Sequence, residues 1–181
     1  TPDWHELTYH EITDVSELVE LPECDVAAIS TFTAKAPDAY LLAERYRDRG
    51  VKTVIGGLHA TAVPQEAMRH CDAVIVGEGE PSWPRLIEDL EAGRLQPMYD
   101  TRGQEVDLAD APIPRFDLID RPSERNRLTI QTQRGCPWRC DFCASSIRLT
   151  RRYKVKPADR VATEIRAIKE LWSEPFIELA D

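Results

Sequence analysis

The chain has 181 residues, of which 42% are hydrophobic and 30% charged, and its formal net charge is −9 at pH 7. This composition is typical of one or two globular domains, and the acidity disfavours nucleic-acid binding because phosphate backbones repel negative charge. No apolar run approaches the ~18 residues of a membrane span, and the start of the chain lacks the pattern of a signal peptide.

Residues 1–95 alternate short apolar runs with amphipathic stretches. The alternation predicts parallel strands joined by right-handed crossovers with helices on both faces, which is a Rossmann-like, doubly wound α/β sheet. The expected strands are 25–30, 51–55 and 73–76, the expected helices are 37–49, 65–70 and 82–91, and residues 5–12 are expected to form an edge strand.

Three polar or glycine-rich segments follow the predicted strands: Ser30-Thr31, Gly56-Gly57 and Gly77-Glu78-Gly79. Sheets of this kind bind ligands beyond the carboxyl ends of their strands. Glycine lets a ligand approach the backbone closely, and the hydroxyls of Ser30 and Thr31 can hydrogen-bond to it. The alternative is that these segments are ordinary tight turns that bind nothing.

Residues 96–126 are punctuated by prolines and lose periodicity, which predicts a linker that lies on a surface through its apolar side chains, Ile113, Phe116, Leu118 and Ile119. A second domain is expected over residues 127–181, with a strand at 128–131, an amphipathic helix at 159–172 and a strand at 176–180. This is too little to close a barrel, so we expect the domain to be cut short at its C-terminus.

The chain has five cysteines, and three of them, Cys136, Cys140 and Cys143, have the spacing Cys-x-x-x-Cys-x-x-Cys. Three thiolates on one tight loop can hold three corners of a 4Fe–4S cluster and leave the fourth iron open to a substrate. A structural zinc site needs a fourth ligand, which is absent nearby, and unliganded thiols are the other alternative. Cys24 and Cys71 are expected to be structural thiols, and the whole set suits a reducing cytoplasm.

The segment from Arg134-Gly135-Cys136-Pro137 to Cys143, directly after a predicted strand, resembles the radical S-adenosylmethionine superfamily. The resemblance implies a partial (β/α) barrel and a 4Fe–4S cluster that reductively cleaves S-adenosylmethionine to a 5′-deoxyadenosyl radical. It places Phe142 against the adenine, and Glu178 or Asp181 near the methionine amino group. It also implies an electron donor such as flavodoxin or ferredoxin.

Residues 1–95 resemble the cobalamin-binding Rossmann-like domain that precedes the radical domain in one large subgroup. The matching segments are 29–32, 54–61 and 76–80, and the linker segment 112–116 also matches. The resemblance implies that cobalamin contacts Ser30, Thr31, Gly56, Gly57, Gly77, Glu78 and Gly79, and that the first strand of the domain lies before Thr1. His59 is interpreted as a polar loop residue and not as a cobalt ligand.

The leading hypothesis is therefore cobalamin-dependent radical methyl transfer to a small-molecule or peptide substrate that the sequence does not name. One alternative is non-methylating radical chemistry, namely rearrangement, cyclisation or sulfur insertion, with a vestigial cobalamin domain. Another is a non-catalytic iron–sulfur or zinc module. The basic segment 148–160 is either a solvated surface or an anion site for a phosphorylated substrate or an acidic electron donor; its cations are Arg148, Arg151, Arg152, Lys154, Lys156 and Arg160.

Overall fold

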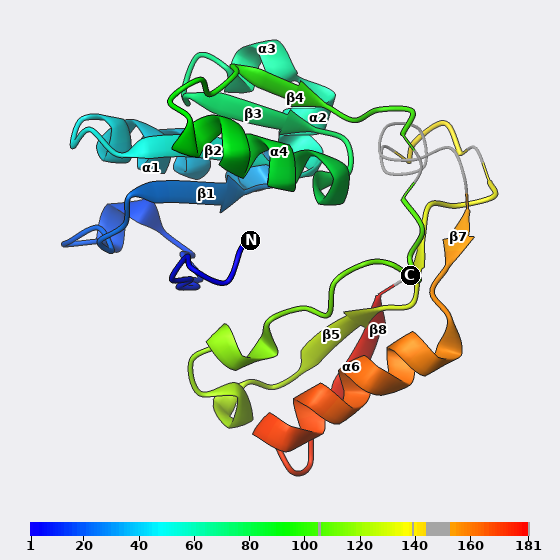
Figure 1. The fold of residues 1–181 in the computed structure, drawn as a ribbon. Coiled ribbons are helices and arrows are strands. Elements are labelled where there is room, and N and C mark those ends of the chain that lie inside the picture. The colour runs from blue at the N-terminus through cyan, green and yellow to red at the C-terminus, as the bar shows by residue number, and fades with distance from the viewer. Residues whose placement is uncertain (105, 139, 144–152, 181) are drawn as a thin grey trace.

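The computed structural model describes residues 1–104, 106–138, 140–143 and 153–180 (Figure 1). Its first part is a parallel sheet of four strands in the order β1-β2-β3-β4. The register pairs Ile29 with Ile55, Ile55 with Val74, and Ile75 with Tyr99. The strands are β1 (Val26–Ser30), β2 (Lys52–Gly56), β3 (Ala73–Val76) and β4 (Met98–Asp100).

The helices of this part are α1 (Ala36–Arg47), α2 (Leu58–Ala62), α3 (Pro64–Ala67) and α4 (Gly79–Glu91), with short 3₁₀ turns at Val15–Glu17 and Thr33–Lys35. A proline lies in the first turn of α1 and of α3, where its missing N–H costs no helical hydrogen bond. Gly50, at φ 79°, follows α1 and takes the left-handed conformation that commonly ends a helix.

Alternate strand residues supply two separate apolar layers. Ile55, Val74 and Val76 pack with α1, α2 and α3 on one face of the sheet. Val54, Ala73 and Ile75 pack on the other face, against Leu86 and Ile87 of α4 and against Tyr99. Because side chains alternate across a strand, each face carries its own core. The expected α/β class, the parallel sheet and the helices on both faces are confirmed.

The connection to β4 differs in hand from the preceding ones. The strand order advances in one direction throughout, yet α1 and α4 lie on opposite faces of the sheet (Figure 1). The β1–α1–β2 and β3–α4–β4 connections therefore have opposite hands, whereas the crossovers that join the three predicted strands lie on one face and share one hand. The apolar side chains of Ala73 and Ile75 explain the placement, because without α4 they would face water.

Three local predictions also need correction. Residues 5–12 form no strand, because none of their backbone groups pairs with the sheet in the part of the chain that is described. Strand β4 lies within the segment expected to be a linker, and the short helix α2 was not predicted. Neither β4 nor α2 exceeds five residues, so neither shows a full period of hydrophobicity.

The second part contains a parallel pair, β5 (Leu128–Gln131) and β8 (Ile177–Ala180), joined through α6 (Ala158–Leu171). Leu128 and Ile130 pack against Ile168 of α6 and against Phe116, which belongs to a 3₁₀ turn at Phe116–Leu118. A further 3₁₀ turn spans Pro122–Glu124. The expected start of a barrel stays a prediction, and no described helix has the length and apolarity to cross a membrane.

A two-stranded antiparallel hairpin, β6 (Gln133–Arg134) and β7 (Lys154–Val155), follows β5. The segment between its strands carries all three clustered cysteines. In Figure 1 the hairpin lies on the side of the sheet toward which the parallel strands point. The topology therefore brings the cysteine segment to the carboxyl edge of the first sheet.

Candidate functional site

The segments that follow β1, β2 and β3 lie side by side at the carboxyl edge of the sheet. Ser30 pairs with Gly56 in the strand register, and the Thr31 amide donates to the Gly56 carbonyl at 3.2 Å. The Gly77 amide donates to Oγ1 of Thr61 at 3.0 Å, which ties the third segment to the second. The structure thus gathers the residues predicted to contact cobalamin.

The glycines at this edge differ in whether packing within the chain requires them. A Cβ on Gly57, at φ 94°, would lie 2.6 Å from the Thr31 carbonyl oxygen, and one on Gly77, at φ 89°, 2.9 Å from Oγ1 of Thr101. A Cβ on Gly56 would make only an ordinary contact, and Gly79 has open space in front of it. Packing within the chain therefore explains Gly57 and Gly77, whereas Gly79 leaves room for a ligand.

The two predicted hydroxyls are also unequal. Thr31 is buried, and its Oγ1 donates to the Phe32 carbonyl at 3.2 Å. Ser30 is exposed at the end of β1. A hollow of about 550 Å³ runs along β1, which is an edge strand of the described sheet, and both residues line it. The exposed Ser30 hydroxyl at the strand end can hydrogen-bond to a polar group such as the nucleotide tail of cobalamin.

His59 lies inside α2 and not in a loop, so its predicted setting is wrong. The side chain is 10% exposed, its Nε2 is 2.9 Å from the Tyr40 hydroxyl, and its Nδ1 is 3.3 Å from Oγ1 of Thr33. Burial, together with the nearby Glu66 carboxylate, raises the pKa of Tyr40 to about 12, so this hydroxyl stays protonated. Both ring nitrogens of His59 are engaged, which gives the residue a structural role.

The cysteine segment is open. Cys140 is exposed, Cys136 and Cys143 are half-buried, and none is in a disulfide. The Cys143 amide donates to the Cys140 carbonyl at 3.0 Å, which bends the chain between these two ligand candidates. No group of three His, Cys, Asp or Glu side chains lies close enough to hold a metal ion within the described ranges. The donor set nonetheless fits an iron–sulfur cluster chemically, because it offers three thiols on one short segment.

The residues expected to contact S-adenosylmethionine are dispersed. Phe142 is 92% exposed, so it is not a core aromatic and is available to cover a ligand. Glu178 is exposed on β8, pairs with Arg127 at 3.2 Å and accepts from Oγ1 of Thr129 at 3.4 Å. Asp181 lies outside the described residues.

Glu78 and Glu80 reach across to the hairpin that carries the cysteine segment. Arg134 donates to Oε1 of Glu78 at 3.2 Å and to Oε1 of Glu80 at 2.8 Å, and Lys154 lies 2.9 Å from Oε2 of Glu78. Burial raises the pKa of Glu80, but its hydrogen bond to Arg134 and the charges of Arg134 and Lys154 outweigh this and lower it. Sequence reasoning missed Arg134 and Lys154 as partners of these carboxylates.

The basic segment does not act as one patch where it is described. Lys154 pairs with Glu78, Lys156 with buried Glu164 at 2.7 Å, and Arg160 donates to the Ala111 carbonyl. These cations serve contacts within the chain. The other candidates for an anion site, Arg148, Arg151 and Arg152, lie outside the described residues.

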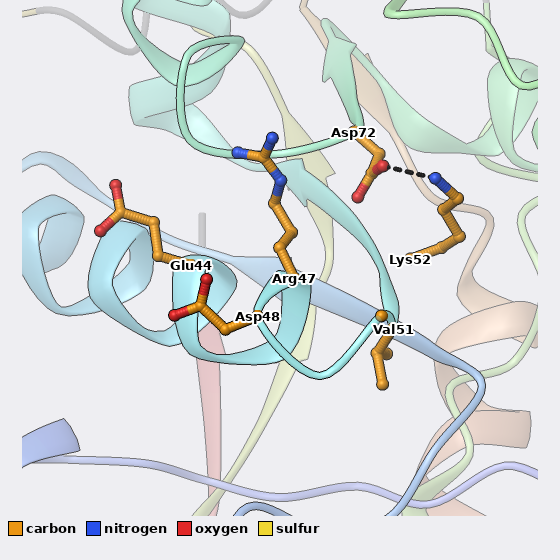
Figure 2. A pocket seen from close by; sticks show the side chains of 7 residues that line it. Glu44, Arg47, Asp48, Val51, Lys52 and Asp72 are labelled. Atoms are coloured by element: carbon orange, nitrogen blue, oxygen red, sulfur yellow. Dashed lines mark hydrogen bonds and ion pairs between the residues drawn. The ribbon is translucent and has the colours of Figure 1, made fainter.

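A second hollow, of about 430 Å³, lies at the opposite edge of the sheet, where β2 and β3 begin (Figure 2). Lys52 donates to Asp72 at 2.7 Å, and the same carboxylate accepts from the amide and hydroxyl of Thr53, each at 3.0 Å. Burial raises the pKa of Asp72, but these hydrogen bonds outweigh it and hold the pKa below its usual value. Asp72, the most buried charged group here, is already paired within the chain, so we interpret this hollow as part of the packing and not as a ligand site.

Comparison with known proteins finds a family similarity for the first part of the chain. The B12 binding domain family matches residues 5–87. The chain is 30% identical over 170 residues to bacteriochlorophyllide d C-8(2)-methyltransferase of Chlorobaculum tepidum, covering 87% of this chain and 38% of that protein. It is 29% identical over 170 residues to hopanoid C-3 methylase of Methylococcus capsulatus, covering 81% of this chain and 33% of that protein.

An uncharacterized methyltransferase of Pyrococcus horikoshii is 30% identical over 196 residues, covering 93% of this chain and 42% of that protein. The chain thus spans about two fifths or less of the length of these curated relatives. No solved structure matches. Residues 5–87 are thus similar to the B12 binding domain family, and the similar proteins are named methyltransferases or methylases.

Proposed function

We propose that this chain, whose residues 5–87 match the B12 binding domain, carries the two cofactor-binding segments of a cobalamin-dependent radical S-adenosylmethionine methyltransferase. The names of the similar proteins support methyl transfer. The cysteine spacing and its place directly after β5 support the radical chemistry. The division into a domain at 1–95, a linker at 96–126 and a second domain from 127 belongs to the same proposal.

The observation that carries the proposal is the contact between the two parts of the chain. Glu78 follows β3 of the B12-binding domain, and Arg134 precedes Cys136 by two residues. Their side chains are 3.2 Å apart. A group bound at the strand ends and a group bound by the cysteines would therefore lie at the same edge of the molecule, where a single substrate can reach both.

The chain's own residues would divide the work as follows. Cys136, Cys140 and Cys143 would hold the cluster as thiolates, and Ser30 with the backbone near Gly79 would orient the cobalamin tail. Phe142, exposed beside Cys143, would cover the adenine of S-adenosylmethionine and exclude water. The chemistry that these groups supply when bound is one-electron cleavage of S-adenosylmethionine to methionine and a 5′-deoxyadenosyl radical, together with carriage of a methyl group by cobalamin.

The test is the production of 5′-deoxyadenosine from S-adenosylmethionine by the anaerobically reconstituted full-length protein, with dithionite as the reductant. Cys140→Ala should abolish the product, because only two cluster ligands remain. Cys24→Ala is the matched control: it removes a thiol outside the segment and should retain production. Undiminished product from Cys140→Ala would contradict the cluster assignment.

The same experiment, read together with the cobalamin and zinc content of the protein, separates the alternatives. Product without retained cobalamin would favour non-methylating radical chemistry with a vestigial B12-binding domain. Absence of product, with zinc found in the purified protein, would favour a non-catalytic module. A flavodoxin or ferredoxin as the physiological reductant and a location in the cytoplasm are part of the proposal, and the substrate is left open.

A further inference from the structure

The base of the cysteine segment places two positive charges together. Arg134 on β6 and Lys154 on β7 are direct partners in the antiparallel register, so they face each other where the hairpin opens toward the cysteines. Like charges directly opposite one another destabilise a strand pair. The hairpin therefore needs anionic partners to stay closed at this point.

Glu78 and Glu80 supply them. Both oxygens of Glu78 lie near Lys154 Nζ, at 3.1 and 2.9 Å, while Arg134 bridges Glu78 and Glu80. The side chains of Glu78 and Lys154 are only 9% and 15% exposed. Two carboxylates thus balance two cations in a site that is shielded from water, where charged hydrogen bonds are strong and loss of one partner is costly.

The backbone of Glu78 is fixed by the B12-binding domain. Oγ1 of Thr101 donates to the Glu78 carbonyl at 2.6 Å. The preceding residue, Gly77, is held by Thr61 through its amide and takes a positive φ that side chains rarely adopt. The Glu78 carboxylate therefore starts from a position set by β3, and its reach to the hairpin transfers that position to the cysteine segment.

We propose that Glu78, supported by Glu80, is a positioning residue that fixes the base of the cysteine segment against the B12-binding domain by pairing with Arg134 and Lys154. This assigns the Glu78 side chain to the contact between the two parts of the chain, where sequence reasoning expected a cobalamin contact. The ion-pair cluster is a property of the chain without cofactors. Only its consequence for methyl transfer, the spacing of the two cofactors, rests on the proposed function.

The direct test is hydrogen–deuterium exchange on the full-length protein without cofactors. Glu78→Gln keeps the shape of the side chain and removes its charge, and it should speed exchange about tenfold or more in peptides that cover residues 133–143. Glu88→Gln is the matched control, because it makes the same change on an exposed position of α4. Peptides that cover β2 should be unchanged in both variants.

Lys154→Gln provides a second route from the hairpin side. It should speed exchange in the same peptides, and combined with Glu78→Gln it should add less than the sum of the two single effects, because both variants break one contact. Unchanged exchange at 133–143 in Glu78→Gln, or an equal increase in β2, would overturn the proposal.

The iron content of the reconstituted protein distinguishes a failure of this proposal from a failure of the proposed function. If the wild-type protein binds no iron and Glu78→Gln still speeds exchange, the positioning role is supported and the cluster assignment is contradicted. Wild-type protein that binds iron, with exchange unaffected by Glu78→Gln, would contradict the positioning role alone.

Discussion

The first sheet and the cysteine segment differ in how far contacts within the chain explain the residues found there. At the strand ends, Gly57 and Gly77 are explained by the backbone and side chains that crowd them, and Thr31 is buried with its hydroxyl bonded. On the cysteine segment, Phe142 is 92% and Trp138 72% exposed, and Cys140 lies open. Contacts within the chain thus explain Gly57, Gly77 and Thr31 without a ligand, whereas the cysteine segment displays aromatic side chains and a thiol that no described residue covers.

This comparison affects how a binding site is recognised. A glycine-rich turn at a strand end has a structural explanation as well as a functional one, and the Cβ distances decide between them residue by residue. The exposed aromatic side chains beside the thiols have no such contact within the described residues.

The largest effect on stability is expected from Gly57→Ala. The new Cβ would clash with the Thr31 carbonyl oxygen and would hold a side chain at a positive φ. We expect about 3 kcal/mol or more of lost unfolding free energy, measured by urea denaturation.

Alanine substitutions at two other glycines separate the contributions of the clash and of the positive φ to this loss of unfolding free energy. Gly50→Ala has the positive φ without the clash and should cost about 1 kcal/mol, and Gly79→Ala, with open space, should be nearly neutral. Equal losses at all three positions would show that the strand-end packing at Gly57 is not special.

Thiol reactivity should separate the two regions by about two orders of magnitude. Burial is the main reason that the pKa of Cys71 is raised from 9.0 to about 11, and its Sγ also donates to the carbonyls of Ala67 and Ala73. Since the thiolate is the reactive form, iodoacetamide at pH 8 should label Cys71 about a hundredfold more slowly than exposed Cys140 in the reduced protein without metal. Peptide mass spectrometry measures both rates, and similar rates would contradict the assigned burial.

A smaller effect is expected from acid. The pKa of Glu80 in the folded chain lies below its usual 4.5, so its pairing with Arg134 stabilises the chain above that value and is lost as the pH falls through the folded pKa. Glu80→Gln should flatten the loss of unfolding free energy below pH 4.5 by about 1 kcal/mol or less. An unaltered pH profile would show that Glu80 adds no pH-dependent stability.

Sequence reasoning succeeded where a pattern is local. The apolar runs at β1, β2, β3 and β5, and the amphipathic periodicity of α1, α4 and α6, all predicted elements that the structure contains within a few residues. The strand β4 was not predicted because it has three residues, of which Tyr99 alone is buried. The opposite hand of its connection depends on which face of β3 lacks cover, and a one-dimensional pattern does not contain that information.

The candidate site was predictable in part. Glycines and hydroxyls at strand ends, and cysteines at a fixed spacing, are visible in the sequence. The partners of Glu78 are not, because Arg134 and Lys154 lie 56 and 76 residues away along the chain. The strand-end position of Glu78 and the resemblance of its segment suggested a ligand contact, because long-range pairing cannot be inferred from neighbouring residues.

The most direct test of the account is a joint count of iron and cobalt in full-length protein that has been reconstituted anaerobically with iron, sulfide and hydroxocobalamin and then desalted. We expect about four irons and one cobalt per chain, with the iron lost and the cobalt kept in Cys140→Ala. Cobalt that is not retained, or zinc in place of iron at the cysteines, would contradict the claim that this chain brings both cofactors to one edge.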